Sequence, residues 1–250
     1  MSGLFNLGGK RALVTGASRG IGRAVAEGLA EAGAEVTLCA RSRTEIEEAC
    51  ALMSTRGWRA RPLVCDVTDI AGFRQHVEAQ APFDIFVNNA GTNRPKPLTE
   101  VTEDDYDAVF GLNTKAAIFA AQAVTAVMLR HGRRGTVINM SSQMGHVGAA
   151  NRTLYCGSKF AIEGFTKALA VELGPAGIRI NTLCPTFIET PMTASYFEDE
   201  EFRRETLSKI KLGRLGQPAD VVGAAIFLAS DASSLMTGSA LMIDGGWTAH

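Results

Sequence analysis

The sequence has little of what marks several classes of protein. Its five cysteines (Cys39, Cys50, Cys65, Cys156 and Cys184) are odd in number, widely spaced and without a CxxC pair. We therefore expect reduced thiols and a cytoplasmic location. The four histidines are scattered without the spacing of metal ligands, which predicts no metal site. A net charge of −1 with no basic block argues against a nucleic-acid partner.

Long hydrophobic runs are also missing. The N-terminus carries no apolar segment of the kind found in signal peptides. The longest apolar run, over residues 116–129, is interrupted by Gln122 and Thr125 and is too short to span a bilayer, so we expect no membrane partner. With 250 residues, of which 46% are hydrophobic, the chain can form one large α/β domain that needs neither disulfides nor metal.

Short runs rich in β-forming residues alternate with longer helical patterns. Strands are predicted at 11–16, 35–40, 61–67, 83–91, 136–142, 178–185 and 239–246, and helices at 21–33, 44–57, 69–81, 102–131, 153–173 and 218–230. Several strands are apolar at successive positions, which is typical of strands covered by helices on both faces. This order predicts an α/β fold with a doubly wound, parallel, seven-stranded sheet in one domain over residues 1–250. The irregular stretch 186–216 is expected to be a substrate-binding loop.

The stretch TGASRGIG, residues 15–22, lies between the first predicted strand and the first helix. Glycine permits a tight turn there and lets backbone approach a ligand, and the helix N-terminus suits a pyrophosphate. The spacing GxxxGxG differs from the commonest dinucleotide fingerprint, and an ordinary tight turn is the alternative. Its place in the first strand–helix unit favours a Rossmann-type dinucleotide site. The predicted contacts are Gly16, Ser18, Arg19, Gly20, Ile21 and Gly22.

The end of the second predicted strand bears on the choice of cofactor. An acidic residue at this point would bind the ribose 2′-hydroxyl of NAD, but here Ala40 is followed by Arg41. Arg19 lies in the glycine loop, and two guanidinium groups near one ribose suit a 2′-phosphate, because arginine binds phosphate bidentately. The sequence therefore predicts NADP(H), with NAD(H) as the alternative if these arginines only solvate the surface.

YCGSK, residues 155–159, places a phenol and an ammonium one helical turn apart. Such pairs are common on solvated helix faces, so the motif alone is weak evidence. On one helix face, a positive charge about 4 Å away could lower the pKa of Tyr155 by up to about three units before desolvation is counted. Tyr155 would then exchange a proton with a carbinol oxygen while hydride moves at carbon. Ser142, at the end of a predicted strand, could bind the same oxygen.

With NNAG at 88–91 and the serine pair at 141–142, these motifs make the chain resemble the short-chain dehydrogenase/reductase family in its compact single-domain form. The resemblance covers essentially the whole chain and lies near 3-oxoacyl-carrier-protein reductases and sugar-acid or polyol dehydrogenases. It implies the catalytic set Asn113, Ser142, Tyr155 and Lys159, in which Asn113 would hold a proton-relaying water. It also implies cofactor contacts from Asp66, Val67, Asn88, Ala90, Gly91, Tyr155, Lys159, Pro185, Ile188 and Thr190. One position departs from the pattern: Thr186 stands where the family usually has glycine, which puts the local loop conformation in question.

The predicted function is NAD(P)-dependent hydride transfer between nicotinamide and a secondary alcohol or ketone. The candidate pocket residues are polar and suit a small substrate such as a sugar acid or polyol: Asn93, Arg94, Gln143, His146, Asn151 and Arg152. A 3-oxoacyl thioester is the alternative substrate, because an acyl carrier protein could dock on the basic residues Arg94, Lys96, Arg203, Arg204, Lys209 and Lys211. A non-catalytic nucleotide sensor is the alternative of another class, which the intact catalytic set disfavours. The alanine-rich stretches 115–130 and 160–173 and the family resemblance together predict a homodimer or homotetramer.

Overall fold

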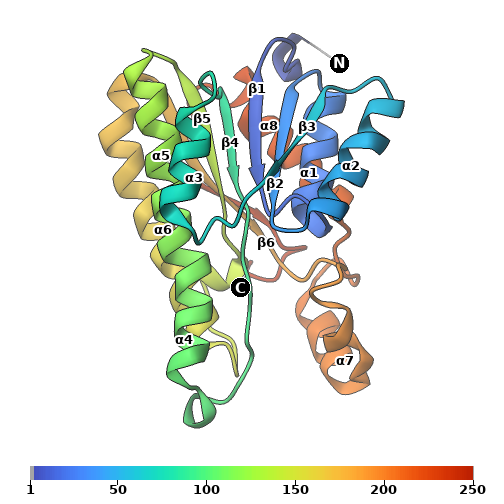
Figure 1. The fold of residues 1–250 in the computed structure, drawn as a ribbon. Coiled ribbons are helices and arrows are strands. Elements are labelled where there is room, and N and C mark those ends of the chain that lie inside the picture. The colour runs from blue at the N-terminus through green and yellow to red at the C-terminus, as the bar shows by residue number, and fades with distance from the viewer. Residues whose placement is uncertain (1–2, 250) are drawn as a thin grey trace.

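A seven-stranded parallel sheet forms the centre of the molecule in this computed structural model, which describes residues 3–249. The strands are β1 (Arg11–Thr15), β2 (Glu35–Ala40), β3 (Ala60–Val64), β4 (Ile85–Asn88), β5 (Gly135–Met140), β6 (Ile178–Pro185) and β7 (Ala240–Ile243). Their order is β3-β2-β1-β4-β5-β6-β7. β1 pairs with both β2 and β4, so the strand order reverses beside it, where open α/β sheets bind ligands. The predicted doubly wound sheet is confirmed (Figure 1).

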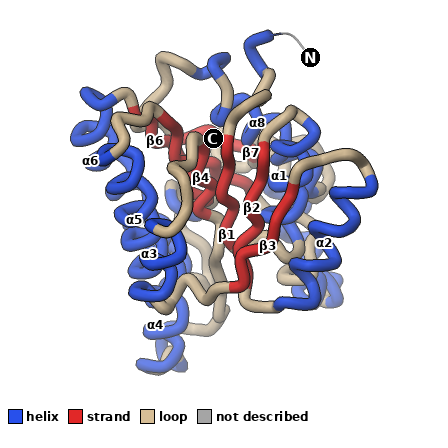
Figure 2. Tube along the Cα trace, turned by 45° about the horizontal axis from the view of Figure 1, so that its top comes forward, coloured by secondary structure: helices blue, strands red, loops and turns tan. Residues whose placement is uncertain are grey.

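Helices cover both faces of this sheet. They are α1 (Gly20–Glu31), α2 (Arg43–Thr55), α3 (Ile70–Glu78), α4 (Glu103–Phe110), α5 (Ala117–Arg130), α6 (Thr153–Leu173), α7 (Glu200–Lys209) and α8 (Pro218–Ala229). Figure 2 shows α1, α2 and α8 on one side of the strands and α3 to α6 on the other. Two separate apolar clusters fill the spaces between the sheet and these two helix layers. The strands are buried at successive positions because both of their faces are covered.

The predicted long helix over 102–131 is not one regular helix. Thr102 caps its start through a capping box with Asp105, and the α-helical bonding pattern then changes to a π-helical one over Gly111–Ala116. The sequence predicted that the apolar run at 116–129 is too short to cross a membrane. By length and composition alone, the longer run 103–130 could cross one. However, 56% of its most apolar window is buried inside the fold, and α5 packs on α3 and the sheet. Burial of this kind is the pattern of a core helix.

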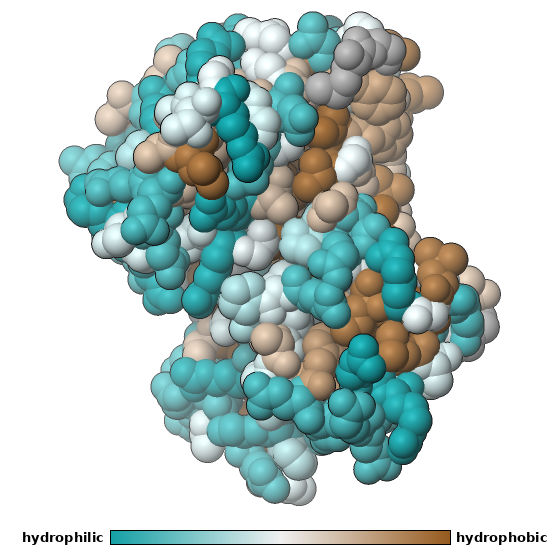
Figure 3. Space-filling view, turned by 90° about the vertical axis from the view of Figure 1, so that its right-hand side faces the viewer, coloured by the Kyte–Doolittle hydropathy of each residue, from teal (hydrophilic) through white to brown (hydrophobic). Residues whose placement is uncertain are grey.

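The stretch after β6 leaves the sheet and forms a small lobe. It contains a 3₁₀ turn (Ala194–Glu198) and α7, and it returns to the body before α8. Figure 3 faces the side of the molecule that carries α7 and shows a waist between the sheet-bearing body and this lobe, with apolar side chains gathered beside it. The lobe has its own apolar centre, in which Phe187 contacts the rings of Phe197, Phe202 and Trp247. This packing holds the 186–216 segment over the ends of β5 and β6.

Candidate active site

The turn between β1 and α1 needs glycine at three positions for two reasons. Gly16 and Gly20 have φ values of +63° and +59°, in the left-handed region that L side chains rarely adopt. Gly22 has no room for a side chain, because a Cβ there would lie 2.4 Å from Asn89 Nδ2 and from the carbonyl oxygen of Gly16. The sequence TGASRGIG therefore forms a tight turn whose backbone lies open at the switch point of the sheet.

Asn89 and Thr15 hold this turn in place, and neither was among the predicted site residues. Asn89 Nδ2 donates to the carbonyl oxygens of Thr15 (2.9 Å) and Gly16 (3.2 Å). Thr15 Oγ1 accepts from the backbone N–H groups of Asn89 and Ala90. The two loops that follow β1 and β4 are thus hydrogen-bonded to each other. NNAG contained the signal, but the sequence does not show which of its two asparagines faces the glycine loop.

The glycine turn has the features needed to bind a phosphate group. Within residues 3–249, no side chain caps the first turn of α1, because Arg19 stands at the N-cap position without a capping bond. The N–H groups of this turn are therefore available to an anion. Thr190 lies across from the turn, with its Cβ and Cγ2 3.6 Å from the position that a Cβ on Gly20 would take. These residues fit the pyrophosphate of a dinucleotide between the loop and Thr190.

The remaining predicted cofactor residues lie along the carboxyl ends of β1 to β4 and β6. Arg41 follows β2, and its side chain is 78% exposed, with one weak ion pair to Asp66 at 3.8 Å. Val67 is buried beside Asp66. Asn88 points into the core instead of the cleft, donating to Ala117 O and Asn139 Oδ1, so its side chain braces the sheet. Ile188 is buried and pairs through a β-bridge with Gly216.

Ser142, Tyr155 and Lys159 converge from two elements. Ser142 follows β5, where its hydroxyl donates to Gln143 Oε1 (2.7 Å) and accepts from the N–H of Met144 (3.1 Å). Tyr155 and Lys159 lie on one face of α6, with Lys159 Nζ 5.5 Å from the centroid of the Tyr155 ring. Lys159 is buried and donates to Met140 O at the end of β5 (2.8 Å), which ties the helix to the strand that carries Ser142.

Burial opposes the predicted lowering of the Tyr155 pKa by Lys159. Burial raises the pKa of Tyr155 to about 12, although a hydrogen bond with Ser142 opposes this rise. Burial also lowers the pKa of Lys159 to about 8. Desolvation of the phenolate is therefore the largest influence on the pKa of Tyr155. A raised pKa suits Tyr155 to donate a proton to a carbonyl oxygen. Oxidised nicotinamide, when bound, would supply the hydride acceptor and a second positive charge.

Asn113 lies in the π-helical turn between α4 and α5. Its Oδ1 accepts from Thr92 N (2.8 Å), and its Nδ2 donates to Thr92 O (2.9 Å) and Ser158 Oγ (3.1 Å). It thereby joins the loop after β4 to the helix that carries Tyr155 and Lys159. Such π-helical turns are frequent at functional sites. The helical pattern in the sequence did not indicate this one. Gly91 lies beside it, because a Cβ there would meet Asn113 Oδ1 at 3.3 Å.

A cavity of about 70 Å³ opens directly on Ser142 and Tyr155. Of the predicted pocket residues, Asn93, Gln143 and Arg152 line it, together with apolar residues of the lobe. The other three do not line it: Arg94 pairs with Asp104 and Asp105, His146 faces Glu163, and Asn151 occupies a left-handed turn at φ +58°. A larger cavity, of about 510 Å³, lies beyond Thr186, but none of the catalytic set lines it. We therefore place substrate in the smaller cavity, beside the chemistry.

Two donors in this cavity have fewer partners than buried polar groups usually have. The Arg152 side chain makes one hydrogen bond, from Nη1 to Asn151 O (3.3 Å), and Gln143 Nε2 makes none among the described residues. Arg152 is 7% exposed, and no carboxylate within residues 3–249 forms an ion pair with it. Its guanidinium instead lies over the rings of Tyr196 (5.2 Å) and Phe202 (5.9 Å), and burial lowers its pKa. Gln143 Nε2 is likewise buried without a hydrogen-bond partner in the described chain. Buried charges are normally paired, so this pocket is built to receive oxygen atoms.

Thr186 does not need to be glycine for conformational reasons. Asn151 is the one non-glycine residue with positive φ among those described, so the backbone of Thr186 is ordinary. Its N–H donates to Ile243 O (3.1 Å), which joins the end of β6 to β7. Its hydroxyl, however, is buried and has no partner among the described residues. Threonine is therefore compatible with the backbone conformation at this position, and the residue lines both cavities.

A glycine turn that fits a phosphate group, beside a set of Ser142, Tyr155 and Lys159, defines a nicotinamide-dependent oxidoreductase acting on alcohols and ketones. A protein-family model described as enoyl-(acyl carrier protein) reductase matches residues 16–248. Together with the relatives below, this match shows that the chain belongs to the short-chain dehydrogenase/reductase family.

Curated relatives and solved structures match nearly the whole chain. A gluconate 5-dehydrogenase of Gluconobacter oxydans is 41% identical over 249 residues, covering 98% of this chain and 97% of the relative. An L-xylulose reductase of Bos taurus is 38% identical and covers 98% and 99%. The crystal structure of a gluconate 5-dehydrogenase from Burkholderia cenocepacia, in complex with NADP and tartrate, superposes with a TM-score of 0.94 at 35% identity, covering 99% and 98%. The predicted NAD(P)-dependent oxidoreductase is thereby confirmed as a class.

Proposed function

We propose that the protein is an NADP(H)-preferring dehydrogenase of a small hydroxy acid, with a sugar acid as substrate. The observation that carries this proposal is Arg152, a buried guanidinium without a carboxylate partner in the described part of the chain, in the same cavity as Ser142 and Tyr155. A substrate carboxylate would supply the missing counter-ion, because arginine binds carboxylates bidentately. The similar gluconate 5-dehydrogenase structure contains tartrate, a hydroxy acid, which supports this class of ligand.

The kinetic test compares an acid with an uncharged polyol of equal length. In Arg152→Met the pocket keeps its volume but loses the cation, so we expect kcat/KM for gluconate to fall about ten- to a hundred-fold. The value for the polyol should change less than about threefold, because its oxygens do not need a charged partner. Arg94→Met is the matched control, because Arg94 already pairs with Asp104 and Asp105 outside the cavity. An equal loss for both substrates would contradict the proposal.

The preference for NADP(H) rests on Arg41 and Arg19. Ala40 ends β2 without an acidic side chain, and the guanidinium of Arg41 has only its weak pair with Asp66 to lose. In Arg41→Ala we expect KM for NADP⁺ to rise about tenfold, whereas KM for NAD⁺ should stay within about twofold. Arg43→Ala is the control, because Arg43 pairs with Glu47 on α2. Equal changes for both nucleotides would overturn the assignment.

A 3-oxoacyl thioester is less well supported. The suggested basic docking patch is partly neutralised, since Arg94 and Lys96 pair with acidic residues of α4 and Lys209 pairs with Glu205. A polyol is the stronger second candidate, because Gln143 and Asn93 offer uncharged donors in the same cavity. Turnover of acetoacetyl thioesters faster than sugar acids would reverse this order.

We also propose that the protein is a cytoplasmic homodimer or homotetramer. The outer face of α6 exposes Phe160 at 50% and Val171 at 79%, which suits burial against a second copy in a homodimer or homotetramer. Light scattering after gel filtration tests this, and a 26.5 kDa monomer would exclude it. All five cysteines are free thiols, which suits the reducing cytoplasm.

A further inference from the structure

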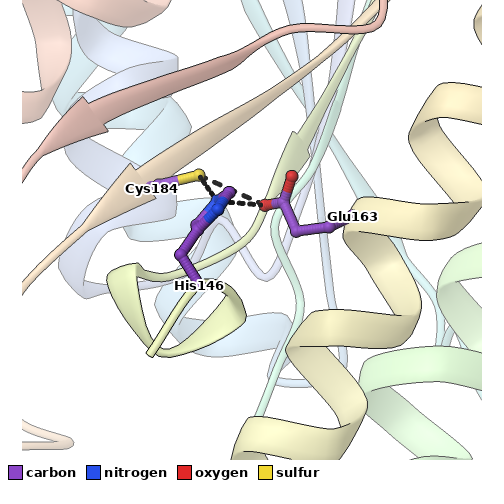
Figure 4. Close-up of side chains that lie close together, drawn as sticks. All are labelled: His146, Glu163 and Cys184. Atoms are coloured by element: carbon purple, nitrogen blue, oxygen red, sulfur yellow. Dashed lines mark hydrogen bonds and ion pairs between the residues drawn. The ribbon is translucent and has the colours of Figure 1, made fainter. Parts of the chain in front are cut away.

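Three side chains that are far apart in the sequence meet behind the catalytic residues. His146 follows the short turn Gln143–Gly145, Glu163 lies on α6 one turn beyond Lys159, and Cys184 lies near the end of β6. Figure 4 shows their ligand atoms pointing toward one another from these three elements. No spacing rule connects them, which is why the sequence indicated no metal site.

The distances among the three atoms match one face of a tetrahedron around a small ion. His146 Nε2 lies 3.3 Å from Glu163 Oε1, Cys184 Sγ lies 3.6 Å from His146 Nε2, and Cys184 Sγ lies 3.3 Å from Glu163 Oε1. Zinc bonds of about 2.0 Å to nitrogen and oxygen and about 2.3 Å to sulfur place tetrahedral ligands about 3.3 to 3.6 Å apart. The three side chains therefore need little movement to hold such an ion.

Burial and orientation also fit a metal centre. Glu163 and Cys184 are buried, whereas the His146 side chain is 32% exposed and leaves a path from solvent. Thr182 Oγ1 donates to the second oxygen of Glu163 (3.0 Å) and so orients the carboxylate. Gly145 lets the turn approach α6, because a Cβ there would lie 3.1 Å from Glu163 Cγ and 2.9 Å from Ser141 Oγ. Glu163 has no lysine or arginine partner within residues 3–249, so a cation would complete its charge balance.

We propose that His146, Glu163 and Cys184 form a Zn²⁺ site with an open fourth position for water. An imidazole, a carboxylate and a thiolate together favour this borderline ion over Mg²⁺ or Ca²⁺. On binding, the S–H bond of Cys184 breaks, the sulfur–zinc bond forms, and one proton passes to solvent. The ion would join β6, α6 and the turn after Ser142, and so brace the elements that carry the catalytic set. This inference does not depend on the identity of the substrate.

Co²⁺ is the probe, because a tetrahedral cobalt thiolate has a charge-transfer band in the near ultraviolet. Protein treated with chelator and then titrated with Co²⁺ should show this band at one equivalent, and Zn²⁺ should displace it. Cys184→Ala should abolish the band, and His146→Gln should weaken binding of Co²⁺ at least about tenfold. The matched controls are Cys50→Ala, a buried thiol on α2, and His131→Gln, an exposed histidine. Both controls should bind as the unaltered chain does.

Thermal unfolding provides a second readout that needs no spectroscopic ion. At about a hundredfold excess of free Zn²⁺ over Kd, Tm should rise by about 5 to 10 °C, and this rise should be absent in His146→Gln. His146 is half-exposed, so this variant keeps the test valid even if Cys184→Ala fails to fold. A missing band together with an unchanged Tm, or binding that survives in both site variants, would show that the three residues only hydrogen-bond to one another.

Discussion

The two walls of the active-site cleft are built differently. On the cofactor side, Asn89, Asn113 and Lys159 each make two or more hydrogen bonds or tie neighbouring elements together. On the substrate side, Arg152 has no carboxylate partner and Gln143 Nε2 has no hydrogen-bond partner in the described chain, and the Arg152 guanidinium lies over aromatic rings of the lobe. The side chains that brace the first wall find their partners within the protein, whereas Arg152 and Gln143 in the second wall keep donors for a substrate.

Because of this difference, we expect the cofactor side to determine rate and stability and the substrate side to determine specificity. A network whose donors are satisfied holds its members in one geometry, so its loss should lower kcat and stability together. Unpaired donors cost stability in the free protein and recover that cost only when a ligand binds them, so their loss should change specificity. Substitutions in each wall can therefore test the division.

Tyr155→Phe should have the largest effect. It removes the hydroxyl that we expect to exchange a proton with the substrate oxygen and keeps the aromatic ring. We expect kcat to fall about a hundred- to ten-thousand-fold, because general acid–base catalysis contributes that much. Turnover of NADPH with the keto substrate measures it. Tyr106→Phe, on the exposed face of α4, should keep the original rate. Near-full activity in Tyr155→Phe would mean that the Tyr155 hydroxyl does not perform the proton transfer.

Features that depend on local backbone geometry could be predicted from the sequence, whereas those that depend on distant side chains could not. The glycine turn and YCGSK were predictable because each depends on local geometry: left-handed φ values at Gly16 and Gly20, and one helical turn between Tyr155 and Lys159. The role of Asn89 and the lack, within residues 3–249, of a carboxylate beside Arg152 were not predictable, because they depend on which distant side chains lie nearby. The rise in the pKa of Tyr155 was not predictable from the motif for the same reason, since burial is a property of the fold.

Lys159→Met should change the pH dependence of the free energy of unfolding, because it removes a buried ammonium group that destabilises the folded protein. The folded pKa is about 8, below the ordinary value of 10.5, so the unfolded chain binds more protons between these two values. Stability of the unaltered protein should therefore rise with pH across that interval, and below it the full cost of burying the charge is present. Relative to Lys159→Met, the gain should reach about 3 kcal/mol.

Urea unfolding of both proteins on either side of this pH interval measures the gain, because all other titrating groups cancel in the difference. Lys167→Met, on the exposed part of the same helix, is the control and should show no such trend. A constant difference between the Lys159 variant and the unaltered protein would show that Lys159 keeps its ordinary proton affinity in the folded state.

Asn113→Ala should weaken the network at the π-helical turn by a smaller amount. The change leaves the N–H and C=O of Thr92 without their side-chain partner. We expect the free energy of unfolding to fall by about 1 to 3 kcal/mol, with kcat reduced as well. Gln122→Ala, on the exposed face of α5, should change stability by less than about 0.5 kcal/mol. If only KM for substrate changed, Asn113 would act in substrate binding and not in holding the cofactor side together.

Substitutions of Thr186 should have the smallest effect on the free energy of unfolding. The sign of the change shows whether the Thr186 hydroxyl has a hydrogen-bond partner. Its hydroxyl is buried without a partner among the described residues, and its backbone does not need glycine. Thr186→Val replaces the hydroxyl by a methyl group of similar size, so the free energy of unfolding should rise by about 1 kcal/mol. Thr186→Gly should instead lower it by about 0.5 to 1 kcal/mol, because glycine gains freedom in the unfolded chain. If Thr186→Val were less stable, its hydroxyl would already have a partner in the folded protein, as the polar groups of the cofactor wall do.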